Sequence, residues 1–185
     1  MIVFLHGLES TVDADLQPIG RKVRWLRRRH PDLVAPGLDT RAAVALQQRC
    51  RSTGAHWFDA PARVAEAFAR PLLHAREAIT PQTSLVIGSS FGGAVLLELL
   101  HQGAWSGPAL FLAGAGIKLT NHRTLPATTR AIFIHGRHDT IVPLDDSRTL
   151  ATASRMPLWE VEDGHRLGSI LEDGTLAAAT RLLMQ

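Results

Sequence analysis

The stretch that decides the fold covers residues 84–100 and reads SLVIGSSFGGAVLLELL. It begins with an apolar run, Ser84 to Ile87, that suits a buried strand, and it ends with a helix-like run, Ala94 to Leu100. Glycines and serines separate the two runs, so the chain is predicted to turn from a strand directly into a helix. That order of elements is typical of a parallel sheet covered by helices.

Five other short runs are rich in Val, Ile, Leu and Phe: Ile2 to Leu5, Leu33 to Ala35, Leu110 to Leu112, Ile132 to Ile134 and Leu158 to Val161. Most are continuous rather than alternating, which is typical of strands buried on both faces. Helix-like segments separate most of them, at 16–30, 41–51, 62–79, 91–102, 145–155 and 175–183, with a kink or break expected at Pro71. The sequence therefore predicts an α/β fold with a mainly parallel six-stranded sheet and helices on both faces.

Length and composition limit the class of protein. A chain of 185 residues with 45% hydrophobic content predicts one globular domain over residues 1–185 and excludes the disordered and fibrous classes. No apolar run approaches the ~18 residues that a membrane helix needs, and no signal-peptide pattern opens the chain. Cys50 is the single cysteine and cannot form an internal disulfide, which fits a reducing compartment, so we expect a cytoplasmic location.

The charge pattern names no macromolecular partner. The formal net charge is +3, and the densest basic stretch, 21–30, contains Val23 and Leu26 at helical spacing. With Leu16 and Ile19 they predict a core-facing stripe, which leaves the basic residues on a solvated helix face. We therefore expect no nucleic-acid binding, with a patch for nucleic acid or an acidic partner as the minor alternative.

The turn in the opening stretch has the pattern GxSxG, with Gly88 and Gly92 on either side of Ser90. In a nucleophile elbow the chain turns so sharply from strand to helix that only glycine fits at these flanking positions, and the serine oxygen is exposed above the sheet. The backbone N–H of Phe91 would then face the oxygen that becomes negative when Ser90 attacks a carbonyl. A glycine-rich turn that only packs a helix on a strand is the alternative.

A serine nucleophile requires a histidine base and an acid that orients its ring, and both follow later strands. Asp139 lies in HGRHDTIVP, residues 135–143, and His165 ends EDGH, residues 162–165. The chain order Ser90, Asp139, His165 is that of α/β hydrolases rather than of chymotrypsin or subtilisin. A metal hydrolase that uses His135, His138 and Asp139 is a weaker alternative, because no other ligand cluster is apparent.

The turn after the first strand is expected to complete the site. It reads HGLES, residues 6–10, and the backbone N–H of Leu8, or that of Glu9, is the expected second oxyanion donor. Gly7 permits a close approach of the chain. His6 is expected to support this loop through buried hydrogen bonds rather than to act as an acid or base.

Together these residues resemble the α/β-hydrolase superfamily, and more narrowly small lidless serine esterases with an HG turn and a GSSxGG elbow. The resemblance runs from Phe4 to His165. It implies a strand order of 2-1-3-4-5-6, no cap domain and no cofactor. It also implies that Ser90 attacks an ester or thioester carbonyl, with His165 as base and then acid and Asp139 as the orienting carboxylate. Two strands that usually precede the HG turn in that superfamily are not expected.

Several points stay open at this level. Trp57 and Phe58 are candidates for lining a shallow acyl pocket that favours short chains, with core packing as the competing explanation. Five basic residues expected near the rim could favour an anionic substrate group: Lys118, His122, Arg123, Arg137 and Arg166. A non-catalytic binding or scaffold protein, an amidase and an acyltransferase remain alternatives to the esterase or thioesterase. The natural substrate and the oligomeric state are not determined.

Overall fold

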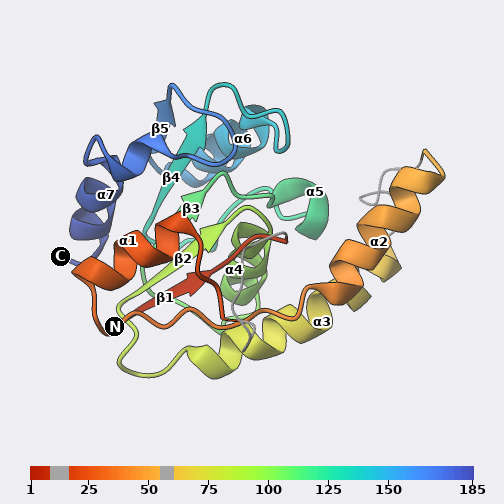
Figure 1. The fold of residues 1–185 in the computed structure, drawn as a ribbon, viewed down its shortest axis with the longest axis horizontal. Coiled ribbons are helices and arrows are strands. Elements are labelled where there is room, and N and C mark those ends of the chain that lie inside the picture. The colour runs from red at the N-terminus through yellow and green to blue at the C-terminus, as the bar shows by residue number, and fades with distance from the viewer. Residues whose placement is uncertain (9–16, 55–60) are drawn as a thin grey trace.

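A computed structural model describes residues 1–8, 17–54 and 61–185, with the side chains of 61–64 and 118 excepted. Its centre is one parallel sheet in the order β1-β2-β3-β4-β5 (Figure 1). The strands are β1 (Ile2–Leu5), β2 (Leu85–Ser89), β3 (Ala109–Leu112), β4 (Ala131–Gly136) and β5 (Leu158–Val161). Because all five run in the same direction, the turns that follow them gather at one edge of the sheet.

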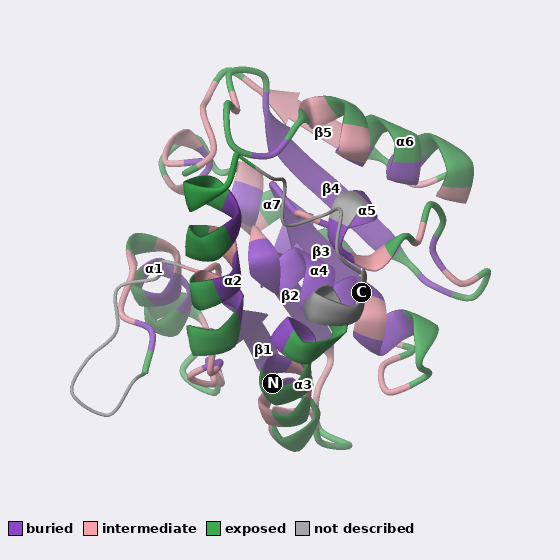
Figure 2. Ribbon diagram, turned by 90° about the vertical axis from the view of Figure 1, so that its right-hand side faces the viewer, coloured by how far each residue is buried: buried purple, intermediate pink, exposed green. Residues whose placement is uncertain are grey.

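Helices cover both faces of the sheet, as predicted. Residues of α1 (Arg21–Arg29) and α7 (Thr175–Leu183) pack on Phe4, Ile87 and Ile134. On the opposite face α2 (Arg41–Ser52), α3 (Pro61–Ala78), α4 (Phe91–His101) and α6 (Leu144–Ser154) belong to the core that contains Leu5 and Val86. Figure 2 shows β1 to β4 buried between helices whose outer surfaces are exposed, whereas β5 is only partly buried.

The predicted six-stranded sheet is wrong by one strand. The run Leu33 to Ala35 forms only a single parallel bridge between Val34 and Val3 at the free side of β1. Val34 donates to the carbonyl of Ile2 at 2.9 Å and accepts from the amide of Phe4 at 2.8 Å. Prolines at 31 and 36 enclose this short run, and a proline has no N–H to continue the pairing. The segment therefore occupies the expected place beside β1 without becoming a strand.

The helices differ from the prediction at two points. The first helix begins at Arg21 rather than at residue 16, because Gly20 has an extended backbone at its N-terminus (φ −60°, ψ 167°). Helix α3 runs through Pro71 as one helix from Pro61 to Ala78, so of the kink or break expected there the break is absent. Its packing against α2 and α4 compensates for the hydrogen bond that a proline cannot donate.

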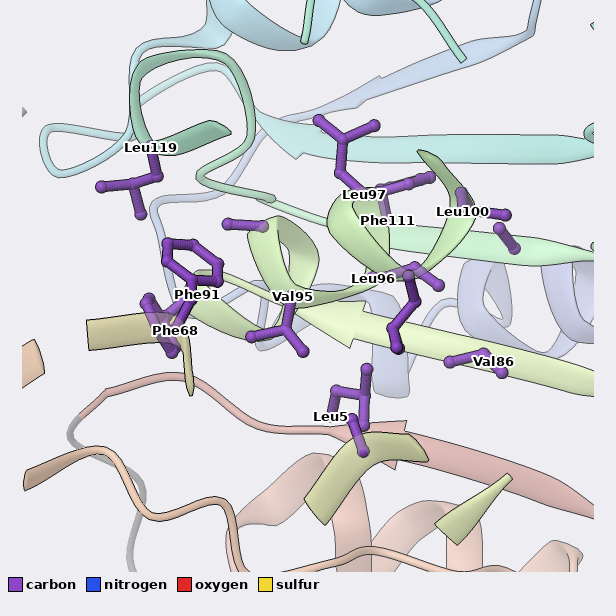
Figure 3. Packing of buried hydrophobic residues seen from close by; sticks show 14 of the residues in the cluster. Leu5, Phe68, Val86, Phe91, Val95, Leu96, Leu97, Leu100, Phe111 and Leu119 are labelled. Atoms are coloured by element: carbon purple, nitrogen blue, oxygen red, sulfur yellow. The ribbon is translucent and has the colours of Figure 1, made fainter. Parts of the chain in front are cut away.

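Helix α4 is the best-buried helix of the described chain, and it fixes the start of the site. The side chains of Val95, Leu96 and Leu97 are fully buried. At its first turn Phe91 packs on Phe68 of α3 with ring centroids 5.0 Å apart (Figure 3). A helix buried along its length cannot shift without opening the core, so the residue before it is held in place.

The connection from β3 to β4, residues 113–130, contains only the short helix α5 (Ile117–Thr120), so no cap domain is inserted there. A single-turn 3-10 helix, η2 (Ser169–Leu171), precedes α7. Across the three described ranges, no helix combines the length and the apolar character required to cross a membrane.

Candidate active site

Ser90 occupies the tight turn between β2 and α4. Its backbone is in an unusual conformation for a residue with a side chain, with φ 53° and ψ −119°. The glycines beside it are required by space: a Cβ at Gly88 would lie 2.6 Å from the carbonyl oxygen of Gly92, and one at Gly92 would overlap the carbonyl of Leu5. The Ser90 amide also donates to the carbonyl of Leu112 at 3.0 Å. The turn predicted from GxSxG is therefore sterically enforced.

His165 lies between Ser90 and Asp139. Its Nε2 is 2.9 Å from Ser90 Oγ, and its Nδ1 is 2.7 Å from Asp139 Oδ2. The three side chains follow β2, β4 and β5, so the parallel sheet brings together residues up to 75 positions apart. With Nδ1–H donating to the carboxylate, the lone pair of Nε2 faces the serine hydroxyl. This arrangement suits proton transfer from Ser90 Oγ.

Asp139 is held in the ionised state. Its side chain is fully shielded from solvent (0% exposed), and burial alone would raise its pKa. Hydrogen bonds from His135 and His165, and from the amides of Val142 and Ile141, oppose this and keep the pKa of Asp139 well below its usual range. The two amide contacts to Oδ1 measure 2.9 and 2.8 Å. A negative charge is therefore fixed behind the His165 ring.

A second histidine, His135, contacts the same carboxylate. From the sequence, His135 was expected only as a candidate metal ligand. Its Nε2 lies 3.0 Å from Asp139 Oδ2 and 3.1 Å from the carbonyl oxygen of Val142, and its Nδ1 lies 2.7 Å from the hydroxyl of Ser147 on α6. The other residue of the metal hypothesis, His138, points away to Glu162 at 3.0 Å and is largely exposed. Within the described ranges no three His, Cys, Asp or Glu side chains form a metal-binding group. The geometry fits support of Asp139.

The first turn contacts the serine turn directly. A Cβ at Gly7 would lie 3.2 Å from the Cβ of Ser90, so the two turns pack closely. His6 is buried, and its Nδ1–H donates to the carbonyl of Gly7 at 2.7 Å while Nε2 accepts from the amide of Leu38 at 2.9 Å. Burial lowers the pKa of His6, although the Gly7 carbonyl opposes this, so the ring is neutral. These contacts give His6 the expected supporting position.

The architecture is similar to that of solved structures. A candidate hydrolase of the alpha/beta superfamily from Xanthomonas campestris pv. campestris aligns with a TM-score of 0.63 and 24% identity, over 98% of this chain and 96% of that chain. A candidate YdeN-like hydrolase from Pectobacterium atrosepticum aligns with a TM-score of 0.58 and 18% identity, over 100% and 92%. The esterase domain of a Rhodothermus marinus protein aligns with a TM-score of 0.53 and 15% identity, over 100% of this chain and 87% of that chain. No family model and no curated protein matches the sequence.

The chain has an α/β-hydrolase fold. Beside Ser90 this fold has a cavity of about 330 Å³, lined by Gly7, Leu8, Lys22, Gln47, Arg51, Ser89, Ser90, Ile141, His165 and Arg166. Lys22, Gln47 and Arg51 were not predicted from the sequence, because they lie on α1 and α2 rather than in the turns after the strands. Leu8, the expected oxyanion donor, does line the cavity.

The other expected substrate contacts have mixed outcomes. Trp57 and Phe58, like Glu9, lie outside the described residues, as does the side chain of Lys118. Of the predicted basic rim, Arg166 lines the cavity, whereas Arg137 forms ion pairs with Glu160 and Glu162. His122 is paired with Glu98 at 3.2 Å and stacks on His101. Both partners lie at the C-terminal end of α4, whereas Ser90 precedes its N-terminus. Arg123 is exposed and lies outside the lining of this cavity.

Proposed function

We propose that this chain is a serine hydrolase that cleaves a carboxylic ester or thioester through an acyl-enzyme intermediate. The observation that carries the proposal is the position of His165, within 2.9 Å of Ser90 Oγ and 2.7 Å of Asp139 Oδ2. Those separations lie in the range that general-base catalysis requires. The strained backbone of Ser90 is a second support, because strain of this kind concentrates at functional sites.

In the first half-reaction Ser90 Oγ forms a bond to the carbonyl carbon while His165 Nε2 takes the hydroxyl proton. The carbonyl π electrons move to the oxygen, and an oxyanion forms. When this intermediate collapses, the bond from carbon to the leaving oxygen or sulfur breaks, and His165 returns its proton to the leaving alcohol or thiol. The fixed charge of Asp139 stabilises the imidazolium that exists between these two transfers.

The second half-reaction uses the same groups with water. His165 removes a proton from water as the water oxygen bonds to the acyl carbon, and a second oxyanion forms. Collapse breaks the bond between the acyl carbon and Ser90 Oγ, which takes the proton from His165. The sum is one ester and one water converted to one carboxylic acid and one alcohol, with no cofactor required.

The oxyanion would be stabilised by two backbone amides, those of Leu8 and Phe91. Phe91 is the first residue of α4, and the N–H groups of a helix's first turn point out of its N-terminus, where the helix dipole also favours negative charge. Leu8 lies in the turn that packs on Ser90 and lines the same cavity. The buried bridge through His6 fixes that turn before substrate binds, as preorganised stabilisation requires.

Small acyl groups fit this site best. The cavity measures about 330 Å³, near the lower limit for small-molecule sites, and no cap is inserted between β3 and β4 to extend it. Leu8 and Ile141 supply apolar surface for a short acyl chain. The same three catalytic side chains could serve an amidase or an acyltransferase, so the class of leaving group and acceptor must be measured.

The direct test is hydrolysis of a panel of 4-nitrophenyl esters from acetate to decanoate, with matched thioesters and anilides, by wild-type protein and Ser90→Ala. We expect esters or thioesters of two to four carbons to have the highest kcat/KM, and Ser90→Ala to abolish turnover. A preference for decanoate would contradict the small pocket. Ester turnover retained by Ser90→Ala would refute the proposed function, and faster transfer to an added alcohol than to water would indicate an acyltransferase.

A further inference from the structure

We propose that the cavity beside Ser90 recognises an anionic group, a carboxylate or a phosphate, on the substrate or on its leaving group. This inference rests on the proposed function and adds to it the substrate class. The cations concerned are Lys22 of α1, Arg51 of α2 and Arg166, which directly follows His165.

The charged residues among the described lining of the cavity are of one sign. Of the ten described residues that line it, three are Lys22, Arg51 and Arg166, and none is Asp or Glu. The side chains of Arg51 and Arg166 form no ion pair with any residue in the described ranges. Three like charges around one cavity repel each other, and an anion between them would remove that repulsion.

A second cavity at the same edge of the sheet provides the contrast. It measures about 590 Å³, includes Asp139 in its lining, and is also lined by two arginines, Arg137 and Arg148. There, however, Glu160 and Asp145 belong to the lining, and Arg148 contacts both at 2.8 and 2.9 Å. Arginines of this second cavity are thus paired with carboxylates of the same lining, whereas Arg51 and Arg166 beside Ser90 form no ion pair with any described residue.

Lys22 contacts the loop that carries His165. Its Nζ donates to the backbone carbonyl of Arg166 at 2.6 Å, which ties α1 to the loop that carries His165. Burial lowers the pKa of Lys22 to about 8; the carboxylate of Asp163 opposes this, whereas Arg166 and Arg21 add to it. A bound anion would raise that pKa again, so binding of an anion and protonation of Lys22 favour each other.

The position of these cations relative to Ser90 suits a short anionic group. A further cavity of about 380 Å³ adjoins the first and shares Gly7, Lys22, Ser89 and Arg166 with it. A charged group held by Lys22 and Arg166 would therefore lie beside the serine turn, where the two cavities meet. An arginine binds a carboxylate or phosphate with two parallel hydrogen bonds, so orientation is fixed as well as charge.

The test compares esters matched in size but not in charge: monoethyl succinate with ethyl valerate for charge on the acyl side, and 3-acetoxypropanoate with butyl acetate for charge on the alcohol side. We expect kcat/KM for at least one anionic ester to exceed that of its neutral partner about tenfold or more at low salt, with the ratio falling as NaCl is added. Inorganic phosphate and succinate should both inhibit hydrolysis of the neutral ester competitively, and the tighter inhibitor identifies the anion.

The variants Arg51→Gln and Arg166→Gln should each lower the ratio of kcat/KM for the anionic ester to kcat/KM for the neutral ester about tenfold. Arg49→Gln, an exposed residue of the same helix as Arg51, is the control and should leave this ratio unchanged. Equal kcat/KM for charged and neutral esters, with neutral turnover still dependent on Ser90, would overturn the anion site alone. Absence of any Ser90-dependent turnover would overturn the proposed function instead, and the anion site with it.

Discussion

Two histidines contact the same oxygen of Asp139, and they differ in what their second ring nitrogen contacts. His165 is 2.7 Å from Oδ2 and His135 is 3.0 Å from it. The other nitrogen of His165 faces Ser90 Oγ, and its side chain is 17% exposed, whereas the other nitrogen of His135 faces Ser147 and its side chain is fully buried. One carboxylate therefore has one partner that lines the cavity beside Ser90 and one that is enclosed in the core.

The two histidines therefore differ in the role that we propose for them: His165 as the base and His135 as a support for Asp139. His165 can exchange a proton with a substrate because its second nitrogen opens onto the cavity beside Ser90. His135 is fully buried between β4 and α6 and does not line that cavity. We expect His135 to be a positioning residue that keeps the Asp139 carboxylate ionised and correctly turned. Substitutions in the two rings should then have effects of very different size.

The largest effect is expected at the reactive ring. His165→Ala removes the base, and kcat should fall roughly 10⁶-fold, because a serine hydroxyl is a very weak nucleophile without one. The measurement is single-turnover hydrolysis of a 4-nitrophenyl ester, with the urea midpoint as a control for folding. A loss of less than tenfold would mean that His165 is not the base.

The next largest effect is expected at the shared carboxylate. Asp139→Asn keeps the shape of the side chain but offers an N–H to the His165 ring, which favours the wrong tautomer. By analogy with the same change in a serine protease, kcat should fall roughly 10⁴-fold. KM should change little, because Asp139 contacts no substrate. If kcat stayed within tenfold of wild type, the orienting role of Asp139 would be excluded.

A smaller effect is expected at the supporting ring. His135→Phe fills the buried site but removes the contact with Asp139 and the hydrogen bonds with Ser147 and the Val142 carbonyl. Loss of the contact to the charged group alone should lower the free energy of unfolding by about 1.5–3 kcal/mol. We expect kcat to fall about tenfold with KM unchanged, and His135→Gln, which can still donate to Asp139, to recover part of the loss. Denaturant unfolding and steady-state kinetics provide the two readouts. A kcat loss as large as that of Asp139→Asn would place His135 in the reaction itself.

The smallest effect is expected from pH, through His6. In the unfolded chain His6 takes up a proton near pH 6.5, whereas in the folded chain burial holds its pKa lower, so the unfolded state binds more protons. Stability should therefore fall as the pH drops below about 6.5, by at most about 1.4 kcal/mol per pH unit for this one group. Asp139, with its pKa below the usual range, adds a further loss only below about pH 4.

Urea midpoints measured between pH 7.5 and 5 test this prediction. His6→Gln should lower the midpoint at every pH and flatten its pH dependence over this range. The same slope in wild type and variant would mean that another group governs the loss of stability, and that His6 is not held neutral by the fold.

The sequence is sufficient to predict those parts of the site that local steric demands determine. Gly88 and Gly92 fix the turn at Ser90, and the strand-like runs Ile132 to Ile134 and Leu158 to Val161 place Asp139 and His165 at the same edge of the sheet. The contact of His135 with Asp139 was not predicted, because a histidine four residues before a carboxylate meets it only if the intervening loop folds back. That fold-back depends on the amides of Ile141 and Val142, which the pattern of side chains does not reveal.

The cavity was the least predictable part. Lys22 and Arg51 reach it from helices on opposite faces of the sheet, and only the packing of those helices decides which of many basic residues face Ser90. The predicted strand at Leu33 to Ala35 could likewise not be judged from composition alone. Val34 has the expected composition and place, but the neighbouring prolines limit its pairing to one bridge.

The central claim is that Ser90 is a nucleophile activated by His165. It is tested most directly by labelling the folded protein with a fluorophosphonate and locating the adduct by peptide mass spectrometry. The account predicts one adduct on Ser90 in wild-type protein, retained in Ser89→Ala, lost in Ser90→Ala and slowed by orders of magnitude in His165→Ala. An adduct on Ser89, or none on folded wild-type protein, would contradict it.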